Sequence, residues 1–368
     1  MRILMLTDRL DSGGAETHLE CLAKELSRMG HGVAVLSGGG RIADGMERLG
    51  ISQYRYLWSD EPLICHLRAG RALKNAILEQ EFDVFHAHTR RMAFLLRKMP
   101  FKRSRIDGKP LTVVTVHAAF SCTPLLRRLC YWGDRTIAVS EDLRARVCDL
   151  FGVPGEAVAV IPNGVDPRRF YPPARPAPTG TVLFASRLDG DCSFGAEWLC
   201  KIAPELRKIH PTLQIRIAGG GDRLDFLREM ALEANRRCGA ETVTVLGNVE
   251  DMAVEYRKSA VFVGVSRAAV EAAMSGCCVI LCGNQGWGGI LSPQNPMPAV
   301  SNFCCRGDGE AGEALLFSAL RDLLGDGNRQ TAVAASARRW MLRDYTSQSM
   351  AEAVARVYGW EGPHGSTV

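Results

Sequence analysis

At 368 residues the chain is long enough to bury two hydrophobic cores, and its 46% hydrophobic and 23% charged residues are ordinary for a globular protein. No apolar run approaches the roughly 20 residues that cross a bilayer, and a net charge of +5 with sparse aromatic interleaving argues against a nucleic-acid partner. The chain enters an apolar segment at residue 3 without a signal-peptide pattern, and its 13 cysteines include no CxxC pair. We therefore expect a reduced, cytoplasmic protein.

The first half alternates short apolar runs with helical spacing. The pattern predicts strands at residues 3–6, 33–36, 83–86, 111–116, 135–139 and 158–161. Apolar residues at positions 15, 19, 22, 23 and 26 have the spacing of a helix face. Strands separated by helices imply right-handed βαβ units and a parallel sheet.

Four prolines crowd into residues 172–178, as is typical of an extended linker, and the alternation then restarts. Strands are predicted at 181–185, 213–218, 242–246, 260–263 and 278–281, with helices at about 194–209, 223–237, 311–324, 329–343 and 347–360. The fold class is therefore α/β, with two Rossmann-like doubly wound domains facing a cleft. We place the first domain at residues 1–173, the second at 180–345 and a last helix at 346–360.

The most informative segment is residues 266–281, which indicates a helix start, a short helix with one carboxylate, a glycine stop and a buried strand. Backbone N–H groups near Ser266 and Ala268 can hold a phosphate. Glu271 can accept two hydroxyl hydrogen bonds, as a ribose offers, so the pair suggests a nucleotide diphosphate ligand. Two other interpretations of Glu271 stay open: it faces solvent, or it pairs with Arg267 four residues earlier.

Further candidates follow the ends of other predicted strands. Arg187 can clamp a diphosphate, or it is a surface arginine. Gly220 lies in a glycine run that ends a strand and opens a helix, where backbone can approach a ligand. Gly13 and Gly14 open the first helix, whose N-terminus can take an anion or a sugar; the alternative is a flexible turn.

His117 ends the 111–116 strand, where its ring can bond a sugar hydroxyl or play a structural part. His86 and His88 share a strand face, but without a third ligand we predict no metal site. The first glycine loop is not GxGxxG and no GxxxxGK[ST] occurs, which argues against an NAD site and a P-loop enzyme.

Residues 90–109 are strongly basic and carry an apolar stripe formed by Met92, Leu95, Leu96 and Met99. Such a helix can rest on an anionic membrane surface, or it is an ordinary amphipathic helix packed on the sheet.

Together these motifs resemble the retaining glycosyltransferases of family 4, which have the GT-B fold, over nearly the whole chain. The resemblance rests on the motifs at residues 13–16, at the strand end marked by His117, and at residues 138–140, 161–166, 186–188 and 270–276. A group of bacterial members with a comparably shortened loop before the ribose-binding glutamate looks similar.

The resemblance implies that the first domain binds the acceptor, the second binds a nucleotide diphosphate sugar, and the last helix crosses back onto the first domain. It assigns Glu271 to the ribose, Arg187 to the diphosphate, His117 to the vicinity of the donor sugar and Gly14 to the phosphate and sugar. No metal or other cofactor is implied. The donor phosphate itself can take the acceptor proton.

Two departures from the family pattern concern the donor site. Val263 stands where many members have a second glutamate, eight residues before Glu271. Residues 189–193 lack the lysine that usually accompanies Arg187. We hypothesise that Arg267 supplies the second positive charge.

These expectations favour transfer of a sugar, with retained anomeric configuration, to a saccharide or lipid-linked acceptor in cell-envelope or capsular polysaccharide assembly. The enzyme would be cytoplasmic, with peripheral contact to the inner face of the membrane. Two rivals remain: a nucleotide-sugar 2-epimerase of GT-B architecture, and a non-catalytic GT-B subunit that supports a partner transferase.

Overall fold

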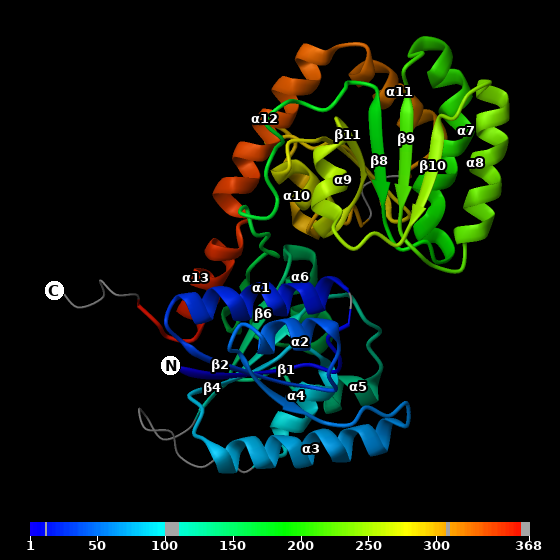
Figure 1. Ribbon diagram of the computed structural model, residues 1–368. Coiled ribbons are helices and arrows are strands. Elements are labelled where there is room, and N and C mark those ends of the chain that lie inside the picture. The colour runs from blue at the N-terminus through cyan, green and yellow to red at the C-terminus, as the bar shows by residue number, and fades with distance from the viewer. Residues whose placement is uncertain (12, 100–109, 307–309, 362–368) are drawn as a thin grey trace. The chain divides into compact units, whose positions relative to one another are not determined.

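The computed structural model describes residues 1–11, 13–99, 110–306 and 310–361. The chain forms two compact units (Figure 1). Unit 1 comprises Met1–Gly164 with Ser347–Val368, and unit 2 comprises Val165–Thr346. Each unit is described by itself below.

Unit 1 contains a parallel sheet of seven strands in the order β3-β2-β1-β4-β5-β6-β7. Its strands are β1 (Arg2–Leu6), β2 (Gly32–Ser37), β3 (Ser52–Arg55), β4 (Val84–Ala87), β5 (Leu111–Val116), β6 (Arg135–Ala138) and β7 (Val158–Val160). Its helices are α1 (Gly14–Arg28), α2 (Arg41–Glu47), α3 (Pro62–Glu79), α4 (Arg90–Arg97), α5 (Pro124–Leu129), α6 (Glu141–Phe151) and α13 (Ser347–Val357), with a 3-10 turn at Gly155–Ala157.

Alternate residues of the central strands supply cores on the two faces of this sheet, as the two-residue period of a strand requires. Ile3 and Met5 pack with α1, α2 and α13 on one face. Leu4 and Leu6 pack with α3 and α4 on the other. The result is a three-layer unit in which every central strand is covered on both sides.

Unit 2 contains a sheet of six strands in the order β10-β9-β8-β11-β12-β13, parallel except for the antiparallel edge strand β13. Its strands are β8 (Thr181–Ala185), β9 (Gln214–Ala218), β10 (Val243–Gly247), β11 (Val261–Gly264), β12 (Cys278–Gly283) and β13 (Gly286–Ile290). Its helices are α7 (Phe194–Ile209), α8 (Leu224–Cys238), α9 (Met252–Arg257), α10 (Ser266–Met274), α11 (Glu313–Leu324) and α12 (Gly327–Asp344), with 3-10 turns at Gly190–Ser193 and Met297–Ser301.

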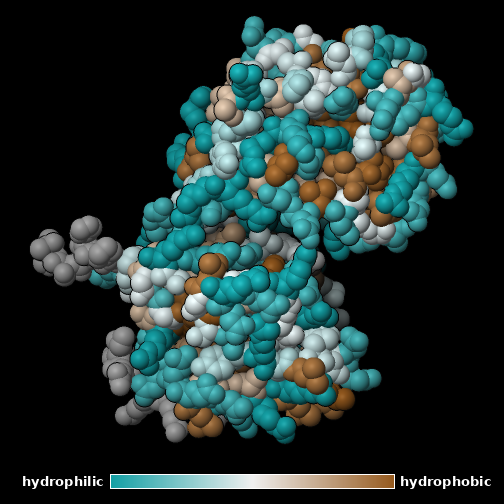
Figure 2. Space-filling model, in the orientation of Figure 1, coloured by the Kyte–Doolittle hydropathy of each residue, from teal (hydrophilic) through white to brown (hydrophobic). Residues whose placement is uncertain are grey.

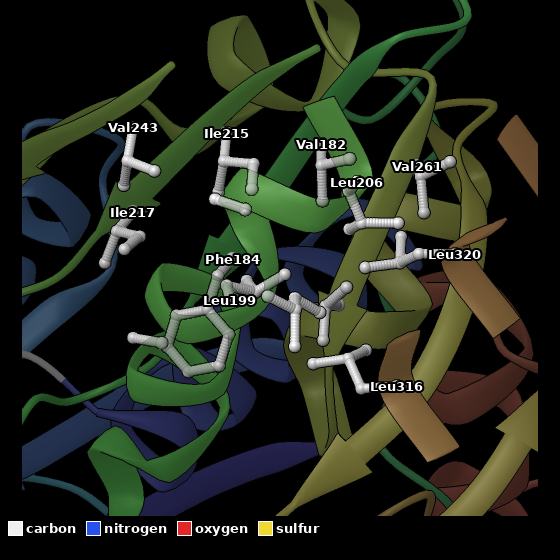
Figure 3. Packing of buried hydrophobic residues seen from close by; sticks show 14 of the residues in the cluster. Val182, Phe184, Leu199, Leu206, Ile215, Ile217, Val243, Val261, Leu316 and Leu320 are labelled. Carbon is white, nitrogen blue, oxygen red and sulfur yellow. The ribbon is translucent and has the colours of Figure 1, made fainter. Parts of the chain in front are cut away.

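The larger core of unit 2 lies between the sheet and helices α7, α8 and α11. Figure 3 shows Phe184, Leu199, Leu206, Leu316 and Leu320 meeting below strands β8 and β9. The opposite face packs Leu183, Phe262 and Val279 against α9, α10 and α12. The two doubly wound α/β units confirm the predicted fold class.

The boundary between the units differs from the predicted one. Residues 165–173 were assigned to the first domain, but Val165 and Phe170 are buried in the core of unit 2 beside Tyr256. The proline-rich stretch at residues 172–178, which was used to place the boundary, begins only after the first segment of unit 1 has ended at Gly164. At the other end, α13 packs against α1 and belongs to unit 1, as the resemblance implied.

In the described part of the chain, no helix is both long enough and apolar enough to pass through a bilayer. The 13 cysteines all lie within the described ranges, and none of them forms a disulfide there.

Candidate active site

The strand order of unit 2 reverses beside β8, whose neighbours are β9 and β11. Ligands of open α/β sheets bind beyond the carboxyl ends of strands at such a switch point. The segments that follow β8 and β11 carry Arg187, Ser266 and Arg267, and Gly220 follows β9. All predicted donor-site residues of unit 2 therefore lie on loops or helix starts at one end of the sheet.

Glu271 lies in the second turn of α10, and its side chain is 13% exposed. Its Oε1 accepts a hydrogen bond from Arg267 Nε at 2.8 Å, and its Oε2 accepts one from the Tyr256 hydroxyl at 3.2 Å. The i,i+4 ion pair left open by the sequence is therefore formed, and the solvent-facing alternative is wrong. A carboxylate has about four acceptor positions, so these two bonds leave capacity for hydroxyl donors.

The N-terminus of α10 is held in an unusual backbone conformation. Ser266 has a φ of 58°, and its N–H donates to the Phe303 carbonyl at 2.7 Å. Asn302, Phe303 and Cys305 also have positive φ, and both Phe303 and Cys305 are buried in the core. Non-glycine residues keep such conformations only where their surroundings impose them, and they concentrate at ligand sites. The first N–H groups of α10, including that of Ala268, have no acceptor within the helix and can bind an anion.

Arg187 lies two residues beyond β8 on an exposed loop. Among the described residues, its guanidinium forms no hydrogen bond or ion pair. The loop beneath it is rigid, because Gly219 has a φ of 142° and a Cβ there would lie 1.9 Å from the Ser186 carbonyl oxygen. The glycine run 219–221, which was predicted to approach a ligand, thus also packs against the backbone next to Arg187. A Cβ at Gly220 would collide with the Asn248 side chain.

Unit 1 has its own switch point between β1 and β4. Helix α1 begins at Gly14, and Gly13 immediately precedes it. Gly13 has a φ of 153°, a backbone conformation that residues with a side chain avoid. A Cβ on Gly13 would clash with the Glu16 carboxylate, whereas Gly14 has open space around it. The N-terminus of α1 is thus accessible at Gly14 and carries an acidic group in its first turn.

His117 directly follows β5, and it belongs to a histidine cluster at the same end of the sheet. His88 Nδ1 lies 3.2 Å from His117 Nε2, and His18 Nδ1 lies 2.8 Å from Asn163 Oδ1. His86 is fully buried behind them and is hydrogen-bonded to Tyr358 and Thr115. His18 comes from α1, and no local pattern predicted that it lies beside His88 and His117.

Burial favours the uncharged form of three of these imidazoles, those of His86, His88 and His117. It lowers the pKa of His117 to about 4 and that of His86 to about 3, and burial with neighbouring histidines holds the pKa of His88 well below its usual value. His117 is therefore a neutral hydrogen-bonding group near pH 7, suited to a sugar hydroxyl rather than to a phosphate charge.

The same cluster bears on metal binding. One ligand nitrogen from each of His18, His88 and His117 lies within 4.8 Å of the others, and neutral imidazole is a common metal ligand. The prediction of no metal site counted only His86 and His88, so it rested on an incomplete ligand set.

A pocket of about 180 Å³ opens beside His117 in unit 1. Its lining includes His88, Arg90, Phe120 and Trp132. The Phe120 and Trp132 rings are stacked at 6.0 Å, and the Arg90 guanidinium lies 4.2 Å from the Phe120 centroid. Stacked aromatic rings beside polar groups suit an apolar or sugar-like ligand, and sequence reasoning missed them because they come from separate loops.

The apolar stripe of residues 90–99 does not face outward. Met92, Leu95 and Leu96 are buried against the sheet in α4. The ordinary interpretation of an amphipathic helix is therefore correct for this segment, and its apolar side cannot enter a membrane. The remaining basic positions, residues 100–109, lie outside the described residues.

Comparison with known proteins matches two family models in tandem. The model described as "Glycosyltransferase Family 4" matches residues 12–169, and the one described as "Glycosyl transferases group 1" matches residues 179–304. The two glycosyltransferase models match the chain in tandem, and its two α/β units have the architecture of GT-B glycosyltransferases.

Individual relatives are distant but cover the whole length. A curated glycogen synthase of Mycobacterium tuberculosis is 26% identical, over 97% of this chain and 94% of its own. A glycosyltransferase structure from Rickettsia africae has a TM-score of 0.74 at 15% identity, covering 97% of both chains. Anabaena Alr3699/HepE, solved in complex with UDP and glucose, has a TM-score of 0.69 at 18% identity, covering 98% of this chain and 99% of its own. At these identities the solved structures establish the fold.

Proposed function

We propose that this glycosyltransferase moves a sugar from a nucleotide diphosphate sugar to an acceptor with retention of the anomeric configuration. One observation supports the proposal: a largely buried carboxylate, a helix N-terminus and an exposed arginine, which has no ion pair in the described part of the chain, all follow the two strands β8 and β11 that adjoin the switch point of unit 2. The carboxylate can bind ribose hydroxyls, the helix N-terminus can bind a phosphate, and the arginine can bind the charged diphosphate.

In the proposed reaction the enzyme acts mainly by placement and electrostatics. The leaving diphosphate gains negative charge as the glycosidic bond breaks. Arg187 and the N–H groups of α10 stabilise that charge in fixed positions. Arg267, held by Glu271, adds a second positive charge at the start of the same helix. The donor phosphate takes the proton from the acceptor hydroxyl, so no metal or enzyme base is needed.

The acceptor binds to unit 1 in this proposal. The pocket beside His117 offers stacked aromatic rings, a neutral imidazole and Arg90. That combination supports a saccharide or a lipid-linked sugar, in which an apolar face is accompanied by hydroxyl or phosphate groups. Assembly of envelope polysaccharide in the cytoplasm is the process that uses such acceptors.

The central test is Arg187→Ala. We expect kcat/KM for donor turnover to fall about 100-fold, because one preformed charge at the leaving diphosphate is lost. Folding should be unaffected, since the side chain has no ion pair among the described residues to lose. Turnover of a nucleotide-sugar panel, followed by release of free nucleotide diphosphate, measures the effect.

Arg228→Ala is the matched control, because it removes an exposed arginine of unit 2 from α8. Full activity of Arg187→Ala together with an unchanged donor Kd would remove Arg187 from the site. Lys at position 187 should recover part of the activity, as a point charge without the planar fork of arginine.

Product analysis separates the rival functions. An epimerase would convert the donor sugar in the absence of acceptor, whereas a transferase forms a new glycoside whose anomeric configuration is read by NMR. A non-catalytic subunit would bind none of the UDP, GDP and ADP sugars. A donor at one hundred times its Kd should raise the unfolding free energy by about 2.7 kcal/mol.

A further inference from the structure

The outward side of α3 is unusual for a helix on the surface of a soluble domain. Its inner side packs Cys65, Ala69 and Leu73 on the sheet. On the opposite side Leu63 is 70% exposed, Leu67 64% and Leu78 76%. Surface helices normally place polar residues there, so this side carries an apolar stripe that the fold does not use.

The charges on the same side have a single sign. Arg71 and Lys74 are exposed between the leucines, and none of the residues 63–78 is acidic. At 100° per residue, the spacing from Leu67 to Arg71 and from Lys74 to Leu78 places cations and leucines together on the solvent face. Figure 2 shows this mixture as brown atoms among teal ones over α3, along the lower edge of unit 1.

The apolar surface continues beyond the helix. Leu57, which lies ahead of α3, is 74% exposed, and Arg68 of the helix donates to its carbonyl at 3.2 Å. Ile64, on the first turn of α3, is 43% exposed. We call these residues, Leu57, Leu63, Ile64, Leu67 and Leu78 with Arg71 and Lys74, the α3 face.

We propose that the α3 face rests on an anionic lipid bilayer, with α3 lying in the plane of the headgroups. Leucines enter the boundary with the acyl chains while Arg71 and Lys74 pair with lipid phosphates, which is the arrangement of interfacial helices. The helix has 18 residues and is therefore about 27 Å long, enough to spread these contacts over several headgroups.

The charge pattern distinguishes this occupant from a second copy of the chain. In a two-fold dimer the same patch meets itself, so Arg71 and Lys74 would be buried against their own like charges. The absence of acidic residues over 63–78 leaves those charges without a counterpart in such a dimer. The phosphates of an anionic bilayer supply negative charges for both Arg71 and Lys74.

This surface deepens the proposed function, because a lipid-linked acceptor would lie in the membrane that α3 contacts. It lies on a different helix from the predicted membrane contact at residues 90–109. Binding to vesicles requires neither donor nor acceptor, so its outcome is independent of the transfer assay.

The test is sedimentation of the full chain with vesicles containing 30% phosphatidylglycerol in phosphatidylcholine, compared with pure phosphatidylcholine. We expect binding to the anionic vesicles that weakens with added salt. The double variant Leu63→Ser/Leu67→Ser should lower the partition coefficient at least tenfold. Arg71→Ser/Lys74→Ser should lower it by roughly fivefold for each charge removed.

Two matched controls lie on α8 of unit 2. Leu232→Ser removes a leucine that is 62% exposed, and Arg236→Ser/Arg237→Ser removes two exposed cations. Both should bind vesicles like the unaltered protein, and a urea titration confirms that each variant is folded. Failure to sediment, equal loss in the control variants, or a dimer in sedimentation equilibrium that Leu63→Ser/Leu67→Ser dissolves would each overturn the proposal.

Discussion

Replacing Glu271 by alanine is expected to lower the free energy of unfolding by about 3–5 kcal/mol and to abolish donor binding. The stability loss arises because Arg267, whose side chain is 10% exposed, loses its carboxylate partner inside the protein. Tyr256, which is also buried, loses a hydrogen-bond acceptor at the same time. Urea denaturation and calorimetric titration with a nucleotide diphosphate measure the two effects.

A double-mutant cycle separates the structural part from the binding part. Glu271→Leu/Arg267→Leu should recover most of the lost stability, since apolar residues often replace a buried ion pair without cost. Donor binding should stay absent, because neither the ribose acceptor nor the second positive charge is restored. Arg267→Ala alone should weaken donor binding strongly, and unchanged affinity would contradict its assignment as a second cation.

The control for Glu271 is Glu205→Ala. Glu205 pairs with Lys208 on the surface of α7, where the two side chains are 54% and 70% exposed. Such pairs contribute at most about 1 kcal/mol. A comparable stability loss in both variants would show that the Glu271 pair is no more than a surface contact.

Acidification from pH 7.5 to 5.5 is expected to lower the free energy of unfolding by about 4 kcal/mol. His86, His88 and His117 have lowered pKa values in the folded state, so only the unfolded chain takes up protons in this window. Their stabilising contribution is complete above the unfolded pKa of about 6.5 and is lost as the pH falls toward the folded values. At pH 5.5 each residue accounts for about 1.4 kcal/mol.

Urea titrations at several pH values measure the slope of the free energy of unfolding against pH. His86→Gln should remove about a third of the contribution that His86, His88 and His117 make to that slope, whatever it does to the stability itself, because one of these three proton sites is removed. Burial also lowers the pKa of His31 and His66, which act in the same direction. A stability that does not change between pH 7.5 and 5.5 would mean that the histidines titrate as if exposed.

The apolar runs predicted most of the fold, because buried parallel strands are short, apolar and bounded by helices. The strands that escaped prediction lack that signal. Strand β13 has the sequence Gly-Trp-Gly-Gly-Ile and forms only because β12 lies beside it, and β3 is a polar edge strand. Periodicity revealed the apolar stripe of α4 and left its orientation open, and only tertiary packing decided that this stripe is buried; α3, in which Leu63, Leu67 and Leu78 are exposed, was not predicted.

At the candidate site, the spacing of residues in the sequence predicted contacts within one turn of a helix but not contacts between different helices. Arg267 and Glu271 were recognisable as neighbours because they are four residues apart on one helix. Tyr256 belongs to a different helix, and His18 lies on α1 far from His117 in the sequence. The left-handed conformation of Ser266 at the start of α10 accompanies a backbone hydrogen bond to Phe303, which no local pattern reveals.

The position of α13 has a consequence for the order of folding during synthesis. The His86 ring bonds to Tyr358, 272 residues later, and Glu25 accepts a hydrogen bond from Ser347. Unit 2 is a continuous stretch of chain, whereas unit 1 is complete only after residues 347–358 have been translated. Most of unit 1 is therefore synthesised before unit 2 but completes its core after it, and until α13 packs on α1 the apolar residues that it covers stay open to chaperones.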